Sequence, residues 1–352
     1  MKIFTAKPLD KSKYILGEGP VFDPRYGRLS WVDIKDGRLY TADLVYSNSK
    51  TGSKIDSGLK CEDMADSGKG KATEKEAELE SLLCMDNIES VSFGQMVGAA
   101  LPLAGTDGFI VAATDGLYLW SGKSGIKPYL DLRDIYEPYQ RSNDAKADPM
   151  GRMFFGSMVY DGLHEDSGNL YRLDNYHSTA KENTLLYKKS GTSSGNTLHH
   201  KVLGIAQENT KLSNGMAWNK TADKFYFSDS SEHAVFVYDY DKETGEISGR
   251  KKLFEIFDLV PDGMCIDEED NLWVAVWGGS RVECRSGENG EKLAEIKVAA
   301  GNVTSCCFAG ESLDKLIITT SGEGQEGEYD GCIFVCDVGV RGVKPDYVKG
   351  IE

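Results

Sequence analysis

Four polar residues occupy the same position of a repeated motif, and all four carry side-chain oxygen. They open the segments EGPVFDP (Glu18), NDAKADP (Asn143), NGMAWNK (Asn214) and DGMCIDE (Asp262). Carboxylate and amide oxygens without thiolate or imidazole are the ligands of a hard cation. The column therefore predicts a site for Ca²⁺, Mg²⁺ or Mn²⁺, with Zn²⁺ less suited. The alternative is that these residues cap strands or form Asx turns, because N-G and D-G are ordinary turn pairs.

Two further charged residues lie near this column. Arg141 precedes Asn143 by two positions, so alternation along a strand places both on one face. Its guanidinium offers a fixed fork of donors to an oxygen-rich substrate, and the alternative is a surface salt bridge. Asp161 follows the run RMFFGSM and is expected in the next loop, either at the mouth of the site or as a solvated turn residue.

The elements that must position these residues are short strands. Alternating apolar runs rich in β-branched and aromatic residues are bounded by Gly, Asp, Asn or Ser, and a second such run follows most of them. The first runs are RLSWVDI, FIVAAT, RMFFGSM, KFYFSDS, NLWVAVW and KLIITTS. Helical periodicity is limited to a weak charged stretch near KATEKEAELESLL. The sequence therefore predicts an all-β protein.

The motif before each first strand is repeated six times. Beside the four good copies stand two looser ones, TSCCFAG from Thr304 and ESVSFGQ from Glu89. Six units of roughly 55 to 60 residues have the size of four-stranded blades, and such arrays close as β-propellers. Each blade presents its innermost strand to one axis, so the polar column converges there. We expect a single six-bladed β-propeller domain over residues 1–352, with a metal site in its central channel.

Two polar segments interrupt the repeat. Residues 47–80 and 178–201 are rich in Ser, Gly and Lys and hold too few apolar residues to pack. We expect both to be surface insertions within blades. The second contains His199 and His200, a pair that has no assigned partner in the repeat.

Composition excludes several classes of partner. The 352 residues are 40% apolar and 27% charged, and 40 Lys and Arg against 56 Asp and Glu give a formal charge of −16. Such a charge repels phosphate backbones and anionic lipid, so we expect no nucleic-acid or membrane partner. No apolar run is long enough to span a bilayer. The five histidines form neither H-x-H nor H-E-x-x-H, which removes the usual zinc spacings.

Eight cysteines are present, without any C-x-x-C pair. A chain of this length does not need disulfides for stability, and the N-terminus MKIFTAKPLDKSKYILGEGP has no apolar signal region. We therefore expect a cytoplasmic protein whose cysteines are buried free thiols.

Long segments of the chain resemble the SMP-30/gluconolactonase/luciferin-regenerating enzyme family of regucalcin-like proteins. The resemblance is carried by LGEGPVFDPRYGRLSWVDI, RSNDAKADPMGRMFFGSM, LSNGMAWNKTADKFYFSDS and PDGMCIDEEDNLWVAVWGGSRV, and covers nearly the whole chain outside the two insertions. It implies a six-bladed propeller that binds one divalent cation in its channel, Ca²⁺ being the foremost candidate, and hydrolyses sugar lactones.

Matched residue by residue, the resemblance implies cation ligands at Glu18, Asn214 and Asp262. It implies substrate binding by Arg141, Asn143 and Asp161. Some relatives have Glu at the position of Asp161, so the shorter side chain leaves the sugar preference open. The implied reaction is hydrolysis of a cyclic ester, with the cation polarising the lactone carbonyl and Asp262 as general base toward water.

Three other functions are compatible with the same pattern. A phosphotriesterase-like hydrolase on a related propeller would accept apolar leaving groups. A scaffold propeller would use the cation only for stability, and a calcium buffer would store it. A single site with three protein ligands and open positions favours the lactonase.

Overall fold

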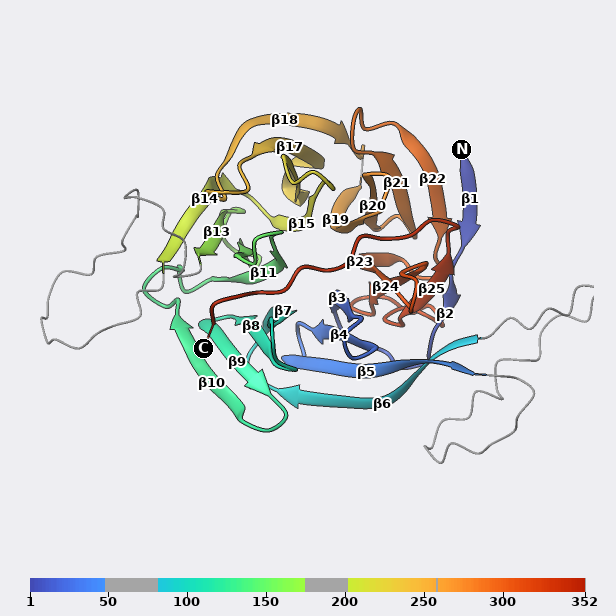
Figure 1. Ribbon diagram of the computed structural model, residues 1–352, viewed down its shortest axis with the longest axis horizontal. Helices are drawn as coiled ribbons and strands as arrows, with labels where there is room; N and C mark the ends of the chain where they lie inside the picture. The colour runs from blue at the N-terminus through green and yellow to red at the C-terminus, as the bar shows by residue number, and fades with distance from the viewer. Residues whose placement is uncertain (48–81, 175–201, 258, 352) are drawn as a thin grey trace, which may run out of the picture.

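Six antiparallel sheets, or blades, surround a central axis in the computed structural model, which describes residues 1–47, 82–174, 202–257 and 259–351 (Figure 1). In each blade the first strand is innermost and the next two follow outward. The all-β, six-bladed propeller predicted from the repeat is therefore confirmed. All six apolar runs RLSWVDI to KLIITTS form the second strand of a blade.

The first three blades each consist of four consecutive strands. Blade 1 contains β3 (Gly17–Asp23), β4 (Arg28–Asp33), β5 (Arg38–Ser47) and β6 (Leu82–Ser92). Blade 2 contains β7 (Val97–Pro102), β8 (Phe109–Ala113), β9 (Gly116–Ser121) and β10 (Gly125–Asp131). Blade 3 contains β11 (Gln140–Ala147), β12 (Met153–Val159), β13 (Gly168–Asp174) and β14 (Val202–Thr210).

The last three blades include both chain ends. Blade 4 contains β15 (Ser213–Trp218), β16 (Lys224–Asp229), β17 (Ala234–Tyr240) and β18 (Ile247–Glu255), with the 3-10 turn η2 (Ser230–Glu232) after β16. Blade 5 contains β19 (Val260–Ile266), β20 (Asn271–Trp277), β21 (Arg281–Ser286), β22 (Lys292–Lys297) and β1 (Lys2–Thr5). Blade 6 contains β23 (Asn302–Ala309), β24 (Lys315–Ser321), β25 (Phe334–Asp337) and β2 (Lys7–Pro8).

The N-terminal strands close the ring. β1 pairs in parallel with β22, and β2 pairs antiparallel with β25 as the outer strand of blade 6. Blade 6 is thus completed by residues from the opposite end of the chain. This pairing ties the last blade to the start of the chain and so closes the array of blades into a ring.

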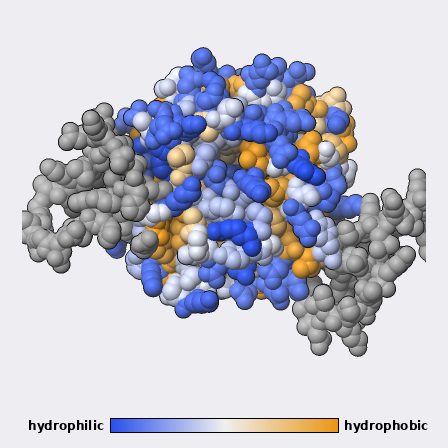
Figure 2. All heavy atoms as spheres, viewed as in Figure 1, coloured by the Kyte–Doolittle hydropathy of each residue, from blue (hydrophilic) through white to orange (hydrophobic). Residues whose placement is uncertain are grey.

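A C-terminal strap, residues 339–351, crosses the middle of one face of the ring (Figure 1). Its backbone bonds to blade 5 (Val343 N to Ile266 O, 3.3 Å) and to blade 2 (Ala104 N to Val348 O, 2.8 Å). Further bonds reach blades 6, 3 and 1. Figure 2 shows that this face is mainly hydrophilic and that atoms cover its middle. The strap therefore joins five blades at the end of the axis where the first and second strands of each blade turn.

The hydrophobic core lies between neighbouring blades. Phe154 of blade 3 packs against Trp218 and Phe225 of blade 4, with ring centroids 5.2 and 5.6 Å apart. Near the axis the blades approach so closely that glycine is required. A Cβ on Gly263 would lie 2.1 Å from Ser305 Oγ of the next blade, and one on Gly98 would lie 2.4 Å from Asn143 O. These contacts fix how near the inner strands come to one another.

A second polar column, five residues after the first, has a purely structural role. Asp148 Oδ1 accepts from the backbone N–H of Met150 and Arg152 at 2.9 and 2.8 Å. Asp267 Oδ1 accepts in the same way from Glu269 and Asn271, both at 2.9 Å. These residues cap the turn between the first two strands of their blades. Turn capping thus explains the second column.

One repeat was assigned wrongly from the sequence. Glu89 lies in β6, the outermost strand of blade 1, and the inner strand of blade 2 is β7, which starts at Val97. The other loose copy, TSCCFAG, does form an inner strand, β23. The predicted insertions 47–80 and 178–201, with His199 and His200, fall almost wholly outside the described residues and remain predictions. In the described part, no helix has the length and apolar character that a bilayer crossing requires.

Candidate functional site at the propeller axis

The predicted residues lie on the inner strands at a distortion that recurs in every blade. The register between the first two strands shifts between Glu18 and Val21, Ser142 and Ala145, Ser213 and Met216, and Pro261 and Met264. Blades 2 and 6 have smaller shifts at the same level. A bulge releases residues from the ladder and redirects their side chains. Glu18, Asn143, Asn214 and Asp262 all lie at or inside such a bulge, and all four are buried.

Hydrogen bonds join three of the predicted residues in a row. Arg141 Nη1 donates to Asn143 Oδ1 at 2.9 Å, and Asn143 Nδ2 donates to Asn214 Oδ1 at 3.0 Å. Asn143 Nδ2 also lies 2.9 Å from the carbonyl oxygen of Ser213. Residues 71 positions apart in sequence, Asn143 and Asn214, therefore meet as the propeller argument predicted.

The second half of the cluster is held by Ser230 at the start of η2. Asn214 Nδ2 donates to Ser230 Oγ at 2.9 Å, and this hydroxyl donates to the carbonyl oxygen of Pro261 at 2.6 Å. Pro261 directly precedes Asp262. The predicted ligands Asn214 and Asp262 are thus linked through one buried hydroxyl.

The two carboxylates are short of positive charge. Burial raises the pKa of Glu18 to about 8, and the nearby Asp144 carboxylate adds to this effect. The pKa of Asp262 is raised well above its ordinary range by burial, then by the negative charges of Glu18 and Asp144. Glu18 Oε2 accepts a 2.7 Å bond from the Gly19 N–H. Three acidic groups therefore lie within electrostatic reach of one another at the axis.

Arg141 is the main cation facing this group. It is 5% exposed, and burial lowers its pKa to about 10 although Glu18 and Asp262 act in the opposite direction. Its Nη1 is bonded to Asn143 and to the carbonyl oxygen of Ser142, but its buried Nε has no hydrogen-bond partner among the described residues. An unsatisfied guanidinium nitrogen beside polar side chains suits an oxygen-bearing ligand.

The residues at the axis fit a hard divalent cation. Two buried carboxylates and an amide oxygen offer the donor set that such ions prefer. A cation would offset both the burial and the repulsion between carboxylates that raise the two pKa values. In the described part of the chain, no three His, Cys, Asp or Glu side chains are placed to hold a metal ion together. The predicted ligands differ from such a group, because only Glu18 and Asp262 are acidic and the third ligand is the amide oxygen of Asn214.

Asp161 differs from the other predicted residues, because its hydrogen bonds lie within its own loop. Its carboxylate accepts from the backbone N–H of Leu163 and His164 at 2.9 and 3.2 Å, and pairs with His164 Nδ1 at 2.7 Å. These bonds lower its pKa. It is half-buried in the loop that follows β12, and among the described residues no bond joins it to Arg141 or Asn143. Its substrate role therefore remains a prediction.

Three residues at the axis were not identified from the sequence. They are Asp144, whose charge reaches both carboxylates, Lys146, whose Nζ donates to Met264 O at 3.0 Å, and Ser230. For Asp144 a signal existed, because the other good copies have Gly at the same position, as in Gly215 and Gly263. Lys146 and Ser230 lie outside the column, and only the three-dimensional arrangement shows that they reach it.

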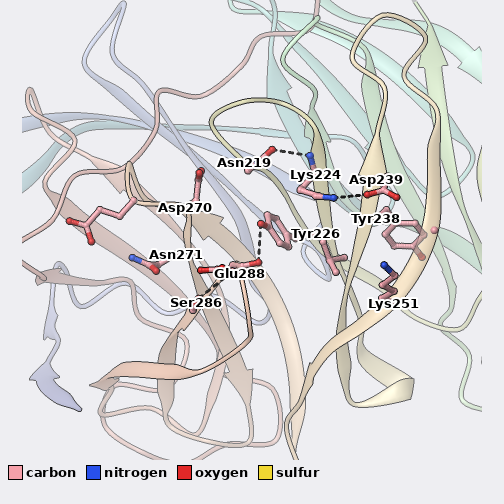
Figure 3. A pocket seen from close by; sticks show the side chains of 14 residues that line it. Asn219, Lys224, Tyr226, Tyr238, Asp239, Lys251, Asp270, Asn271, Ser286 and Glu288 are labelled. Atoms are coloured by element: carbon pink, nitrogen blue, oxygen red, sulfur yellow. Dashed lines mark hydrogen bonds and ion pairs between the residues drawn. The ribbon is translucent and has the colours of Figure 1, made fainter.

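A cavity of about 630 Å³ lies away from this cluster, between blades 4 and 5 (Figure 3). None of the predicted residues lines it. Lys224 Nζ is paired with Asp239 Oδ1 at 2.5 Å, and Tyr226 OH donates to Gly287 O at 3.1 Å. Several polar groups that line the cavity are therefore hydrogen-bonded to other residues that line it.

Comparison with known proteins places the chain in one family. The model of the SMP-30/Gluconolactonase/LRE-like region matches residues 16–322. Regucalcin from Danio rerio is 31% identical over 269 residues, which are 73% of this chain and 82% of that protein.

Two solved structures share the fold over nearly their full length. Luciferin-regenerating enzyme has a TM-score of 0.74 at 25% identity and covers 98% of this chain and 99% of its own. The calcium-binding protein regucalcin from Agrobacterium tumefaciens has a TM-score of 0.73 at 20% identity and covers 99% of both chains. With its family match over the propeller and its polar column at the axis, this chain belongs to the SMP-30/gluconolactonase/luciferin-regenerating enzyme-like family.

Proposed function

We propose that this protein is a divalent-metal-dependent hydrolase that opens sugar lactones, of the aldonolactone type, to the corresponding sugar acids. The observation that carries the proposal is the convergence of buried side-chain oxygens at the axis. Asn143 Nδ2 bonds to Asn214 Oδ1 at 3.0 Å, and Ser230 links Asn214 to the carbonyl that precedes Asp262. Glu18 and Asp262 are buried there as well. Family membership supports the reaction class, since gluconolactonases belong to the matched family.

The cation would be held by Glu18, Asn214 and Asp262. Ca²⁺ suits carboxylate and amide oxygens best, and Mg²⁺, Mn²⁺ and Zn²⁺ are the alternatives. When bound, such an ion supplies a Lewis acid that polarises an ester carbonyl and stabilises negative charge on its oxygen. The bond from Asn143 to Asn214 Oδ1 leaves that oxygen a second lone pair for the ion.

The substrate would be oriented by the neighbouring polar groups. Arg141 has an unpartnered Nε and Asn143 has an amide at the axis, so both can bond the hydroxyls of a polyol. Asp161 would contribute from the loop after β12 once its bonds to the 163–164 backbone are exchanged for substrate. Holding the ring in one orientation brings the carbonyl close to the attacking water.

Asp262 is the proposed general base. Its carboxylate can accept the proton of a water molecule that attacks the lactone carbonyl, and can return it to the ring oxygen as the ester bond breaks. The side chain is 6% exposed, so little bulk water competes for it. A phosphotriesterase-like activity would not need Arg141 and Asn143, and is the alternative that the assay must exclude.

A lactone panel on metal-stripped protein tests this function. Hydrolysis of glucono-δ-lactone and related sugar lactones is followed by acid release at constant pH, before and after reloading with Ca²⁺, Mg²⁺, Mn²⁺ or Zn²⁺. We expect no turnover without metal and recovery with at least one ion. Turnover of organophosphate triesters in place of lactones, or no turnover with any ion, would refute the proposal.

We further propose a cytoplasmic location. Its support is the state of six buried cysteines in the described part of the chain, all of which are free thiols. Cys265 and Cys306 approach to 3.6 Å between sulfur atoms without a disulfide. This arrangement suits a reducing compartment.

A further inference from the structure

The backbone that carries Asp262 is held from two sides by side chains of other strands. Before it, Ser230 Oγ of blade 4 donates to Pro261 O at 2.6 Å. After it, Lys146 Nζ of blade 3 donates to Met264 O at 3.0 Å. Pro261 and Met264 are the two residues between which the β19–β20 register shifts. Side-chain bonds therefore hold the bulge on both sides of the point where the strand ladder is interrupted.

Ser230 also fixes a second predicted ligand. Its hydroxyl accepts from Asn214 Nδ2 at 2.9 Å, which orients the amide so that Oδ1 is on the side of Asn143. The serine itself is 1% exposed, and its backbone N–H is anchored to Leu212 O at 3.0 Å. One immobilised hydroxyl thus accepts from the predicted ligand Asn214 and donates to the carbonyl of Pro261, the residue directly before the predicted ligand Asp262.

We propose that Ser230 is a positioning residue of the cation site, which sets the orientation of the Asn214 amide and the place of Asp262 together, and that Lys146 holds the Asp262 bulge from the opposite side. The inference rests on the proposed function in that Asn214 and Asp262 are taken as cation ligands. Groups that bond to metal ligands commonly change affinity by 10- to 100-fold when removed, because the ligands lose their preset geometry.

Ser228 provides a matched control on the same stretch of chain. It is fully buried in β16, two residues before Ser230, and within the part of the chain that the structure describes its hydroxyl has no hydrogen-bond partner. Ser228→Ala and Ser230→Ala remove the same atom from equally buried sites. Only Ser230→Ala leaves the Asn214 amide and the Pro261 carbonyl without their partner.

Both variants are prepared as the full chain, stripped of metal with a chelator and titrated with Ca²⁺ by calorimetry. We expect Ser230→Ala to weaken Ca²⁺ binding about tenfold or more and Ser228→Ala to change it less than twofold. Thermal unfolding in chelator measures how far each change affects the fold alone. Equal Ca²⁺ affinities of the two variants would overturn the proposal.

Lys146 gives a test in which the sign of the effect is decisive. Removing a positive charge from the neighbourhood of a cation site tightens cation binding by electrostatics alone. If Lys146 instead holds the bulge, Lys146→Met weakens Ca²⁺ binding about threefold or more, whereas Lys146→Arg keeps charge and donors and stays near wild type. Tighter binding in Lys146→Met would contradict its positioning role.

The outcomes separate this inference from the proposed function. Wild-type protein that binds Ca²⁺ but opens no lactone refutes the lactonase, while the Ser228 and Ser230 comparison still decides the positioning role. Wild-type protein that binds none of Ca²⁺, Mg²⁺, Mn²⁺ and Zn²⁺ refutes both. A Ser230→Ala variant that matches Ser228→Ala in an active, Ca²⁺-binding background refutes only the inference.

Discussion

Buried carboxylates in two regions of this propeller have pKa values that are shifted in opposite directions. On β21, the Glu283 carboxylate is paired with Arg281, Arg285 and Lys292 at 2.7, 2.5 and 2.8 Å. Burial alone would raise its pKa, but these bonds outweigh burial and lower it to about 2. At the axis, Glu18 and Asp262 share one arginine, and burial raises the pKa of Glu18 to about 8.

The difference separates a carboxylate that is neutralised by side chains of its own blade from a carboxylate pair that is not. The β21 carboxylate has all the positive charge it needs from its own chain. The axial pair has been buried without it, and a divalent cation would supply the missing charge. The first cluster should therefore contribute to stability and the second to binding and catalysis.

The largest expected effect is on turnover. Asp262→Asn keeps the size of the side chain and one ligand oxygen but removes the base, so we expect a loss of 10² to 10⁴ in kcat at saturating metal. The fold should persist and metal affinity should fall. Circular dichroism tests whether the fold persists, and steady-state lactone kinetics over a range of metal concentrations measure kcat and the metal requirement. Wild-type turnover at saturating metal would show that Asp262 is only a ligand.

The matching change at β21 should affect stability and leave catalysis intact. The pKa of Glu283 lies about 2.5 below its ordinary value of 4.5, which corresponds to about 3 kcal/mol. Glu283→Gln should lower the free energy of unfolding by that order. In the wild type this contribution is present above pH 4.5 and is lost as the pH falls toward 2. Urea unfolding of wild type and variant at pH 7 and pH 3 measures the stability difference and its pH dependence. A difference as large at pH 3 as at pH 7 would contradict the role of the ionised Glu283 carboxylate.

In metal-free protein, Glu18→Gln should raise the free energy of unfolding, whereas Glu283→Gln should lower it. Because the pKa of Glu18 is raised to about 8, the folded state holds a proton that the unfolded state releases, and stability falls as the pH rises from about 4.5 to 8. Removing the acid should raise the free energy of unfolding by about 2 kcal/mol at pH 8, since part of the burial cost remains with the amide. Chemical unfolding in chelator tests this, and destabilisation would mean that Glu18 is already well paired. Ca²⁺ should stabilise the variant less than the wild type.

The smallest expected effect is that of Arg141→Ala. Loss of its bonds to substrate should raise KM about tenfold with little change in kcat, because uniform binding is lost. Removal of a positive charge should leave cation affinity equal or slightly higher. Kinetics and calorimetry separate the two. A large fall in cation affinity would instead make Arg141 part of the scaffold that holds the ligands.

The sequence was sufficient to predict the number of blades and to indicate four polar residues on the inner strands. It was insufficient where a blade has no polar residue at the repeated position. The inner strand of blade 2 carries Val97 in place of a polar residue, so its copy of the motif is almost invisible, and Glu89 was taken in its stead. Ser230 and Lys146 act through contacts between blades, and a repeat within the chain cannot reveal such contacts. The strap has no repeat partner at all and was not anticipated.

The strap also bears on how the protein is made. Residues 339–351 are synthesised after blades 1, 2 and 3, yet they bind all three. The pairing of Lys7 with Val335 imposes the same condition on blade 6. Contacts this distant in sequence form slowly. The ring can therefore be completed only after residues 335–349 have been synthesised, however early the first blades form.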